Sequence, residues 1–235
     1  MGMNSEHARS IVMDLETVAI DGAADYLQPP EAPANYTKAE SIAAYVKQAT
    51  EKAVSKCSLD PDLCRIVALG WLRTGVDDEP RVLTCRDESE EIYALNEFWA
   101  SVRRPYGGGV FPLVTFNGLR FDLPVVMRRS LYLDVKYPFM NIDRYRTTHL
   151  DLWQKLSYNG AISAHGLQFY AKRFDLPIDP DPVKGEDIAA LVKEGSDVCW
   201  RAVQNHCASD VKTTYLLAVR LGLIETTDDD PAMVA

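Results

Sequence analysis

The stretch Ile11-Val12-Met13-Asp14-Leu15-Glu16-Thr17 decides the fold, because it reads as an apolar strand that ends in two acids. Side chains alternate between the two faces of a strand, so Asp14 and Glu16 are expected on one face and Leu15 on the other. Two neighbouring carboxylates at the end of an apolar strand are costly unless a cation neutralises them. A divalent metal ion bound through oxygen atoms would do so, although an isolated Asp-x-Glu pattern often occurs by chance.

A second candidate acid follows a later apolar stretch. Val110 to Phe116 is expected to form a strand, Asn117-Gly118 a turn and Phe121 to Leu133 a helix. Asp122 would then lie near the N-terminus of that helix, where a carboxylate could also serve only as a cap or complement the helix dipole. Asn117 could likewise be no more than a turn residue.

The third candidate pair lies in the last helix, which is expected from about Asp197 to Leu221. Residues four apart share one face of a helix, so His206 and Asp210 should point the same way. A buried hydrogen-bonded His–Asp pair without catalytic function is the alternative explanation. Neither the second nor the third pattern identifies a function by itself.

The remaining pattern predicts an α/β fold with a mixed central sheet flanked by helices. Val18 to Tyr36 reads as a long irregular loop, and a helix is expected from Thr37 or Ser41 to about Lys56. The other expected elements are strands Arg65–Arg73 and Arg81–Cys85, a helix from Asp87, and helical segments Asp151–Tyr158, His165–Phe174 and Glu186–Lys193. Residues 1–10 are expected to be a disordered segment or tag remnant, 11–225 a single domain, and 226–235 a frayed acidic tail.

Composition narrows the class of protein. The chain has 235 residues, 47% of them hydrophobic, which suffices for a packed core. A net charge of −9 does not suit a protein that coats nucleic acid, although an enzyme that gathers carboxylates around metal ions is locally acidic. Five cysteines without a Cys-x-x-Cys pair predict reduced structural thiols. We expect a cytoplasmic location, since no apolar run suits a membrane span or a secretory signal.

In chain order, the three acidic patterns resemble those of the DEDD superfamily of 3′→5′ exonucleases. The resemblance covers nearly the whole chain and is strongest to the predicted exonucleases similar to the proofreading domain of family-B DNA polymerases. Further stretches carry it: Pro33-Ala34-Asn35-Tyr36, Arg65-Ile66-Val67-Ala68-Leu69-Gly70, Phe116-Asn117-Gly118, Phe121-Asp122-Leu123-Pro124, His149-Leu150-Asp151-Leu152 and Asp210-Val211-x-x-Thr214.

The resemblance implies an RNase H-like fold and a site for two divalent ions, Mg²⁺ or Mn²⁺. Asp14 would bridge both ions, Glu16 and Asp210 would complete the tighter site, and Asp122 would hold the second ion largely through water. Two such ions, about 3.5–4 Å apart, stabilise the attacking and leaving oxygens of a phosphoryl displacement. The products would be nucleoside 5′-monophosphates released from a 3′ end.

One residue departs from the superfamily pattern. One branch has a tyrosine four residues before the last acid, and the other has a histidine five residues before it. Here His206 stands four before Asp210 and Asn205 five before it. His206 would therefore orient or deprotonate the attacking water, a role that suits an imidazole near neutral pH.

Candidate substrate contacts are Thr17, Asn117, Arg120 and Phe121, although a strand end, a turn and packing behind the acids are competing interpretations. Basic residues also concentrate in the middle of the chain, which suits a groove that follows phosphates but equally a solvated surface. They are Arg103, Arg104, Arg120, Arg128, Arg129, Lys136, Arg144, Arg146, Lys155, Lys172 and Arg173. Asp175 to Pro182 reads as a rigid connection.

The expected partner is the 3′ end of single-stranded DNA, and the sequence leaves a replication or repair partner open. RNA is the main alternative substrate, because no residue here decides whether a 2′-hydroxyl is recognised. Two further hypotheses are a nucleic-acid-binding module without catalysis and a protein whose acids are purely structural. Retention of all four acids argues against a module that has lost catalysis.

Overall fold

Strand β1 (Ile11–Ala19) is the central strand of a five-stranded sheet with the order β3-β2-β1-β4-β5. The computed structural model describes residues 10–104, 109–138, 140–143, 149–178 and 180–224. β1 pairs antiparallel with β2 (Cys64–Arg73) along its whole length, but it pairs in parallel with β4 (Leu113–Thr115) only through Ile11 and Val12. Beyond Val12, the β4 side of β1 therefore has no strand partner among the described residues.

The sheet is completed by a short strand on either side. β3 (Arg81–Thr84) pairs antiparallel with β2, and β5 (Leu150–Asp151) pairs in parallel with β4. The mixed sheet agrees with the α/β prediction. The predicted strand at Val110 to Phe116 is shorter in the structure, and the sequence does not predict β5, because two residues carry no periodicity.

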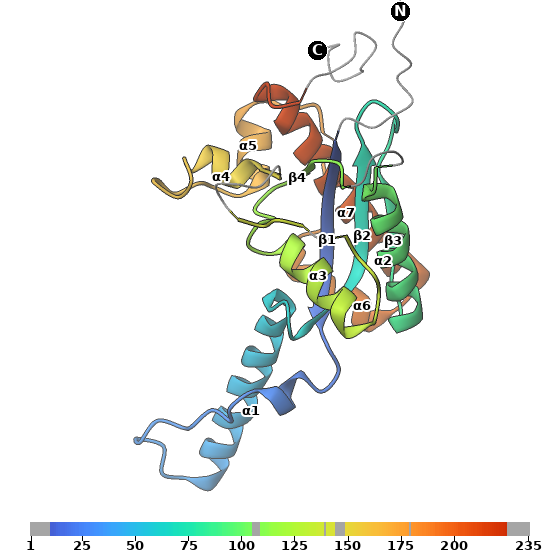
Figure 1. Cartoon of the computed structure of the whole chain (residues 1–235). Helices are drawn as coiled ribbons and strands as arrows, with labels where there is room; N and C mark the ends of the chain where they lie inside the picture. The colour runs from blue at the N-terminus through green and yellow to red at the C-terminus, as the bar shows by residue number, and fades with distance from the viewer. Residues whose placement is uncertain (1–9, 105–108, 139, 144–148, 179, 225–235) are drawn as a thin grey trace, which may run out of the picture.

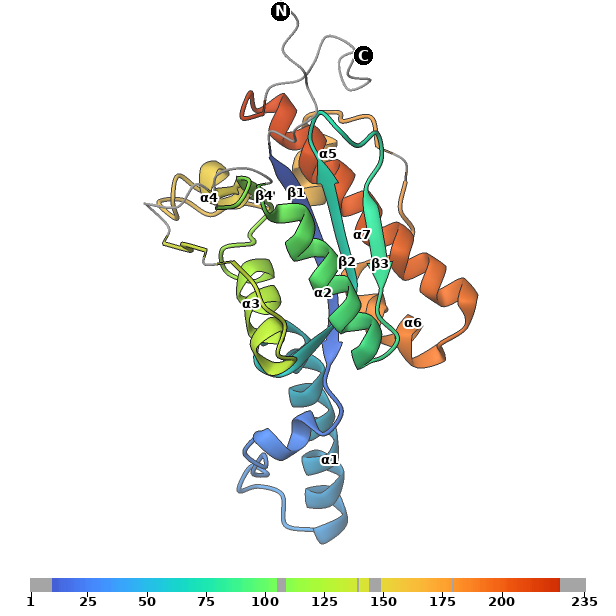
Figure 2. The same ribbon diagram turned by 45° about the vertical axis from the view of Figure 1, so that its right-hand side comes forward.

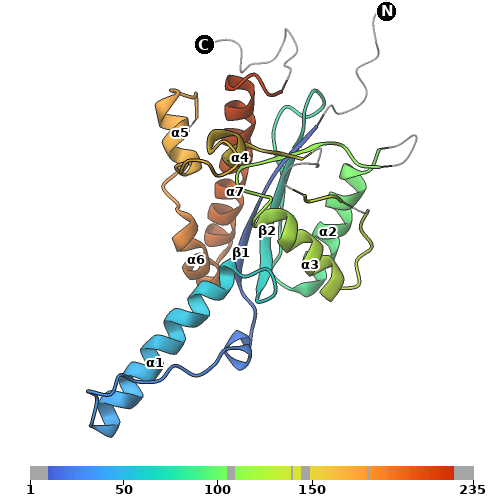
Figure 3. The same ribbon diagram turned by 60° about the vertical axis from the view of Figure 1, so that its left-hand side comes forward.

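Helices cover both faces of the sheet (Figures 2 and 3). On one face, α2 (Glu88–Val102) and α3 (Asp122–Tyr132) pack on Ile11, Met13 and Leu15 of β1. On the other face lies α7 (Asp197–Arg220), which packs on Val12 and has α5 (Leu167–Arg173) and α6 (Ile188–Glu194) beside it. The remaining short elements are α4 (Leu152–Leu156) and the 3-10 helices η1 (Ala23–Tyr26), η2 (Cys57–Leu59) and η3 (Gly185–Asp187).

Helix α1 (Ala39–Lys56) extends away from the sheet (Figure 1). None of its residues is buried; Tyr45, Val46 and Ala49 are half-buried and Ile42 is 36% exposed. A helical period predicts the helix but does not reveal whether another layer lies opposite it. The predicted loop from Val18 to Tyr36 contains the end of β1 and η1.

Arg129, which the sequence analysis counted among the residues of a possible basic groove, is buried. Its Nε and Nη2 donate to Oε1 and Oε2 of Glu91 at 2.7 and 2.9 Å, and both side chains are buried. Glu91 Oε1 also accepts from the backbone N–H of Ile66 at 3.0 Å, so the pair fastens α2 and α3 to β2. Arg129 is thus a core residue that no phosphate reaches, because a sequence cannot show whether a long charged side chain has a buried partner.

The described part of the chain begins at Ser10 and ends at residue 224. The segments 1–9 and 225–235, which hold most of the predicted disordered start and the acidic tail, lie outside the described residues. Ser10 is buried, and its backbone N–H donates to Thr74 Oγ1 at 3.0 Å.

All five cysteines are free and buried. No described helix has the length and apolarity needed to cross a membrane. A single domain from 11 to 225 stays a prediction.

Gly70 sets how closely α7 approaches the sheet. A Cβ atom at Gly70 would lie 2.8 Å from Cys207 Sγ and 3.0 Å from Val211 Cγ2, closer than packed atoms tolerate. We expect Gly70→Ala to lower the free energy of unfolding by about 1–3 kcal/mol, as overpacking does, in a urea titration. Gly185→Ala, where no atom lies within 4 Å of the new Cβ, is the matched control. Equal stability of the Gly70→Ala and Gly185→Ala variants would contradict this close packing.

Candidate functional site

The site begins on the α7-facing side of β1. Because Met13 and Leu15 pack under α2 and α3, alternation turns Asp14 and Glu16 toward α7. The backbone carbonyl of Asp14 accepts a weak hydrogen bond from Cys207 Sγ at 3.6 Å, which links β1 directly to α7. The register between β1 and β2 shifts at Glu16 and Thr17, and such irregularities frequently re-aim side chains next to active sites.

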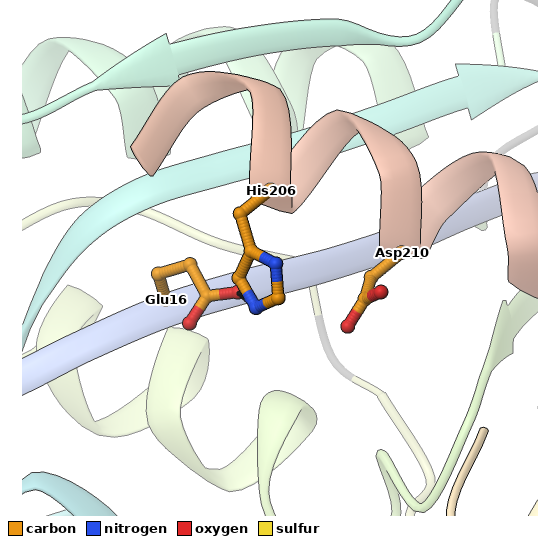
Figure 4. Close-up of side chains that lie close together, drawn as sticks. All are labelled: Glu16, His206 and Asp210. Carbon is orange, nitrogen blue, oxygen red and sulfur yellow. Dashed lines mark ion pairs between the residues drawn. The ribbon is translucent and has the colours of Figure 1, made fainter. Parts of the chain in front are cut away.

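Helix α7 places His206 and Asp210 opposite these acids, one turn apart on the same face, as predicted. His206 Nε2 lies 3.5 Å from Glu16 Oε1. One possible ligand atom from each of Glu16, His206 and Asp210 falls within 4.8 Å of the other two, which suits a single metal ion (Figure 4).

Asp122 joins the group from the other side of the sheet. It is the first residue of α3, is 5% exposed, and accepts a hydrogen bond from the backbone N–H of Leu15. That N–H is accessible because β1 has no strand partner beyond Val12 on this side. The open edge of β1 therefore lets an acid from α3 lie beside acids from β1 and α7.

Burial raises the pKa values of all four carboxylates, and neighbouring acids add to the effect. Burial, followed by the charges of Asp122, Asp210 and Glu16, raises the pKa of Asp14 well above its usual value. Burial and neighbouring acids raise the pKa of Glu16 to about 8, although the nearby His206 opposes this, and burial raises the pKa of Asp122 to about 7. The pKa of Asp210 is raised by burial as well. A divalent cation is the natural counter-charge for such a set, so the donor atoms fit a metal site.

A turn supported by Asp151 fixes the position of Asp122. The carboxylate of Asp151 accepts from the backbone N–H groups of Asn117 and Leu119 at 2.9 and 3.1 Å, and it also caps α4. Asn117 has a φ of 67°, a left-handed conformation that asparagine tolerates, which confirms its role as a turn residue. At Gly118 a Cβ would lie 2.2 Å from Thr115 Oγ1, so only glycine fits this turn.

Comparison with known families then identifies the kind of protein. Residues 58–232, more than half of the chain, match a family described as a predicted 3′-5′ exonuclease related to the exonuclease domain of PolB. The chain belongs to this family. The match contains Asp122, His206 and Asp210 but begins after Asp14 and Glu16, which β1 brings to the same place.

A solved structure gives the same fold. The chain is similar to the family B DNA polymerase from the hyperthermophilic archaeon Pyrobaculum calidifontis, with a TM-score of 0.57 and 15% sequence identity. The similarity covers 91% of this chain but 24% of the polymerase, so the chain corresponds to a small part of that protein. The RNase H-like fold predicted from the sequence is thereby confirmed. No curated protein matches the sequence.

Two residues that the sequence did not reveal support the side chains of α7 in this site. Asp181 Oδ2 lies 2.6 Å from His206 Nδ1, and Gln168 Nε2 donates to Asp210 Oδ1 at 3.0 Å. The sequence pattern indicates only a rigid connection around Asp181. Neither residue is near its partner in sequence, so no spacing could have predicted these contacts.

The predicted substrate contacts have different environments. Thr17 Oγ1 donates to the backbone carbonyl of Ser58 at 2.5 Å, so this hydroxyl is engaged within the protein. Phe121 is half-buried against the core under α3, as the packing interpretation expects. Arg120 is exposed, and its guanidinium lies 5.9 Å from the centre of the Trp153 ring. Asn117 Oδ1 is buried without a hydrogen-bond partner among the described residues.

Two of the other basic residues have partners within the protein. Arg128 lies 3.4 Å from Asp62, and Arg103 donates to the backbone carbonyl of Lys136 at 3.4 Å. Arg144 and Arg146 lie outside the described residues.

The raised pKa values predict how pH affects the metal-free protein. Asp14 and Glu16 bind their protons more tightly in the folded state, so both contribute to a fall in stability as pH rises; for Glu16 the fall extends from about 4.5 to about 8. We expect Asp14→Asn to flatten this fall and to raise the melting temperature at pH 8 in the presence of chelator. Mn²⁺ should stabilise the wild type more than the variant, by differential scanning fluorimetry.

The control for this prediction is Glu51→Gln, which neutralises an exposed acid on α1 and should follow the wild type throughout. If Asp14→Asn and the wild type have parallel pH profiles, the Asp14 carboxylate does not have a raised pKa in the folded protein.

Proposed function

We propose that the protein is a 3′→5′ exonuclease that removes nucleoside 5′-monophosphates from the 3′ end of single-stranded nucleic acid, with DNA favoured. The observation that carries the proposal is the meeting of Glu16, His206 and Asp210 within 4.8 Å of one another, with Asp14 and Asp122 beside them. Membership of a family of predicted 3′-5′ exonucleases supports the same reaction.

The four acids would hold two divalent ions, Mg²⁺ or Mn²⁺. Oxygen ligands from carboxylates are those that these cations prefer, and the raised pKa values mean that a bound cation would offset the cost of burying these charges. When bound, the ions supply Lewis-acid chemistry and charge stabilisation for phosphodiester hydrolysis. Asp14 would contribute to both ions, Glu16 and Asp210 to one, and Asp122 to the other.

His206 would position the attacking water and accept its proton. Burial lowers the pKa of His206, but the hydrogen bond to Asp181 and the charges of Glu16 and Asp210 outweigh it, so the pKa is raised overall. Asp181 engages Nδ1, which leaves Nε2 facing Glu16 and the acids. Asp181 thus acts as a positioning residue that selects the ring orientation of His206.

DNA is favoured as the substrate because the family is related to a DNA polymerase exonuclease domain. RNA is the second candidate, because discrimination between the two rests on contacts to the 2′-hydroxyl.

The direct test is degradation of a 5′-labelled single-stranded DNA and of its RNA counterpart. With Mn²⁺ or Mg²⁺ we expect a ladder that shortens from the 3′ end and disappears with chelator. Glu16→Gln and Asp210→Asn should each reduce the rate by at least about 100-fold, since each removes a charged ligand. The faster of the two substrates decides between DNA and RNA.

Glu51→Gln on α1 is the matched control and should degrade both strands at the wild-type rate. Absence of cleavage with both metals and both strands would refute the proposal and favour a nucleic-acid-binding module, with His206 in place of tyrosine as the first suspect.

The positioning role of Asp181 predicts a change in the pH dependence of catalysis. Removing the charge of Asp181 and weakening its hydrogen bond lowers the pKa of His206, so in Asp181→Asn the acidic limb of the kcat–pH profile should move to lower pH. The plateau of kcat should fall by roughly 10-fold while KM stays the same, because the base is less well oriented.

Asp175→Asn supplies the control, because Asp175 is an exposed residue of the same loop with a φ of 52° that asparagine tolerates. A uniform loss of rate in Asp181→Asn, without movement of the acidic limb, would assign Asp181 a purely structural role.

A further inference from the structure

Helix α5 and the residues just before it bring aromatic, amide and basic side chains beside the acids. Within α5, Gln168 and Lys172 are four residues apart and share a helical face with the neighbouring Phe169. His165 lies just before the helix and stacks its ring on Phe169. Gln168 Nε2 reaches Asp210 Oδ1 at 3.0 Å. The face therefore borders the site, since Gln168 contacts one of the four carboxylates.

The rings of His165 and Phe169 are stacked, with centroids 3.9 Å apart and planes at 26°. His165 is held from below, because its backbone N–H donates to the Tyr170 hydroxyl at 3.2 Å. Tyr170 in turn packs against Phe116 and Phe174. The contact with Tyr170, which is itself packed against other aromatic rings, thus helps to fix the stacked pair before a strand binds.

Core packing does not account for Phe169. Leu167 and Ala171 of the same helix are buried, whereas Phe169 is 46% exposed and His165 is exposed too. Lys172, one turn further along the helix, is also exposed. A fixed aromatic surface with a cation beside it is the arrangement with which proteins bind single-stranded nucleic acid, by stacking on bases and contacting phosphates.

We propose that the His165–Phe169 pair stacks on one base of the strand whose 3′ end enters the site, and that Lys172 contacts a phosphate near that base. This inference rests on the proposed function and names a subsite within it. Stacking tolerates every base, because each has a π face, and so the subsite would bind single strands without sequence preference. It also requires an unpaired base, which would select single strands over duplexes.

The test measures binding, not cleavage. Fluorescence anisotropy follows 5′-fluorescein single-stranded DNA with Ca²⁺ as the metal, with one abasic residue placed in turn at each position near the 3′ end. For the wild type we expect one position at which loss of the base weakens binding by roughly 5- to 100-fold. Phe169→Ala should weaken binding of intact DNA to the same degree and should be insensitive to the abasic residue at that position.

Two further variants serve as controls for this binding measurement. Phe169→Trp keeps a stacking surface and should retain both tight binding and the abasic effect. Tyr93→Ala removes an aromatic ring of similar exposure, 54%, on α2 and should behave as the wild type. Equal binding by Phe169→Ala and the wild type, or equal sensitivity of both to the abasic series, would overturn the inference.

The proposed function is tested separately with thymidine 5′-(p-nitrophenyl phosphate), which has no upstream base. Hydrolysis of this ester by the wild type reports on the acids alone. If the ester and the oligonucleotides stay intact but the abasic effect persists, the exonuclease proposal fails while the stacking subsite stands. If the ester is hydrolysed and the abasic effect is missing, only the subsite fails.

Discussion

The burial of four carboxylates beside one another is the constraint on which the rest of this structure depends. Asp14, Glu16, Asp122 and Asp210 come from three elements, and each is held where its charge is disfavoured. The fold tolerates this because the elements are fastened elsewhere: α7 by contact with Gly70, and α3 by the buried Arg129–Glu91 pair. Stability in the layers around the site thus offsets electrostatic strain within it, a common arrangement where a protein binds cations.

The sequence predicted those parts of the site that depend on local periodicity. Alternation placed Asp14 and Glu16 on one face, where their charges interact. The helical repeat placed His206 beside Asp210, as the structure has them. What could not be predicted depends on contacts between segments far apart in the chain. Asp181 and Gln168 reach their partners across loops, and nothing in their own neighbourhoods distinguishes them from surface residues.

The same distinction explains which features of the fold the sequence did not predict. A helical pattern predicted α1 correctly as a helix, but whether its stripe is covered depends on a layer that is not encoded in the helix itself. Arg129 looked like its exposed neighbour Arg128 because a guanidinium is normally solvated, and only the presence of Glu91 beside it makes burial tolerable. β5, with two residues, is defined by its pairing with β4 rather than by its composition.

Because all five thiols are buried, their reactivity can be used to follow local opening of the fold. Burial raises the pKa of Cys64 to about 12 and that of Cys207 well above its usual value, so neither thiol is reactive while the layers stay closed. Cys207 lies between α7 and the sheet, next to the carbonyl of Asp14. The rate of Cys207 alkylation therefore measures how often α7 separates from β1. Cation binding at the acids should lower this rate.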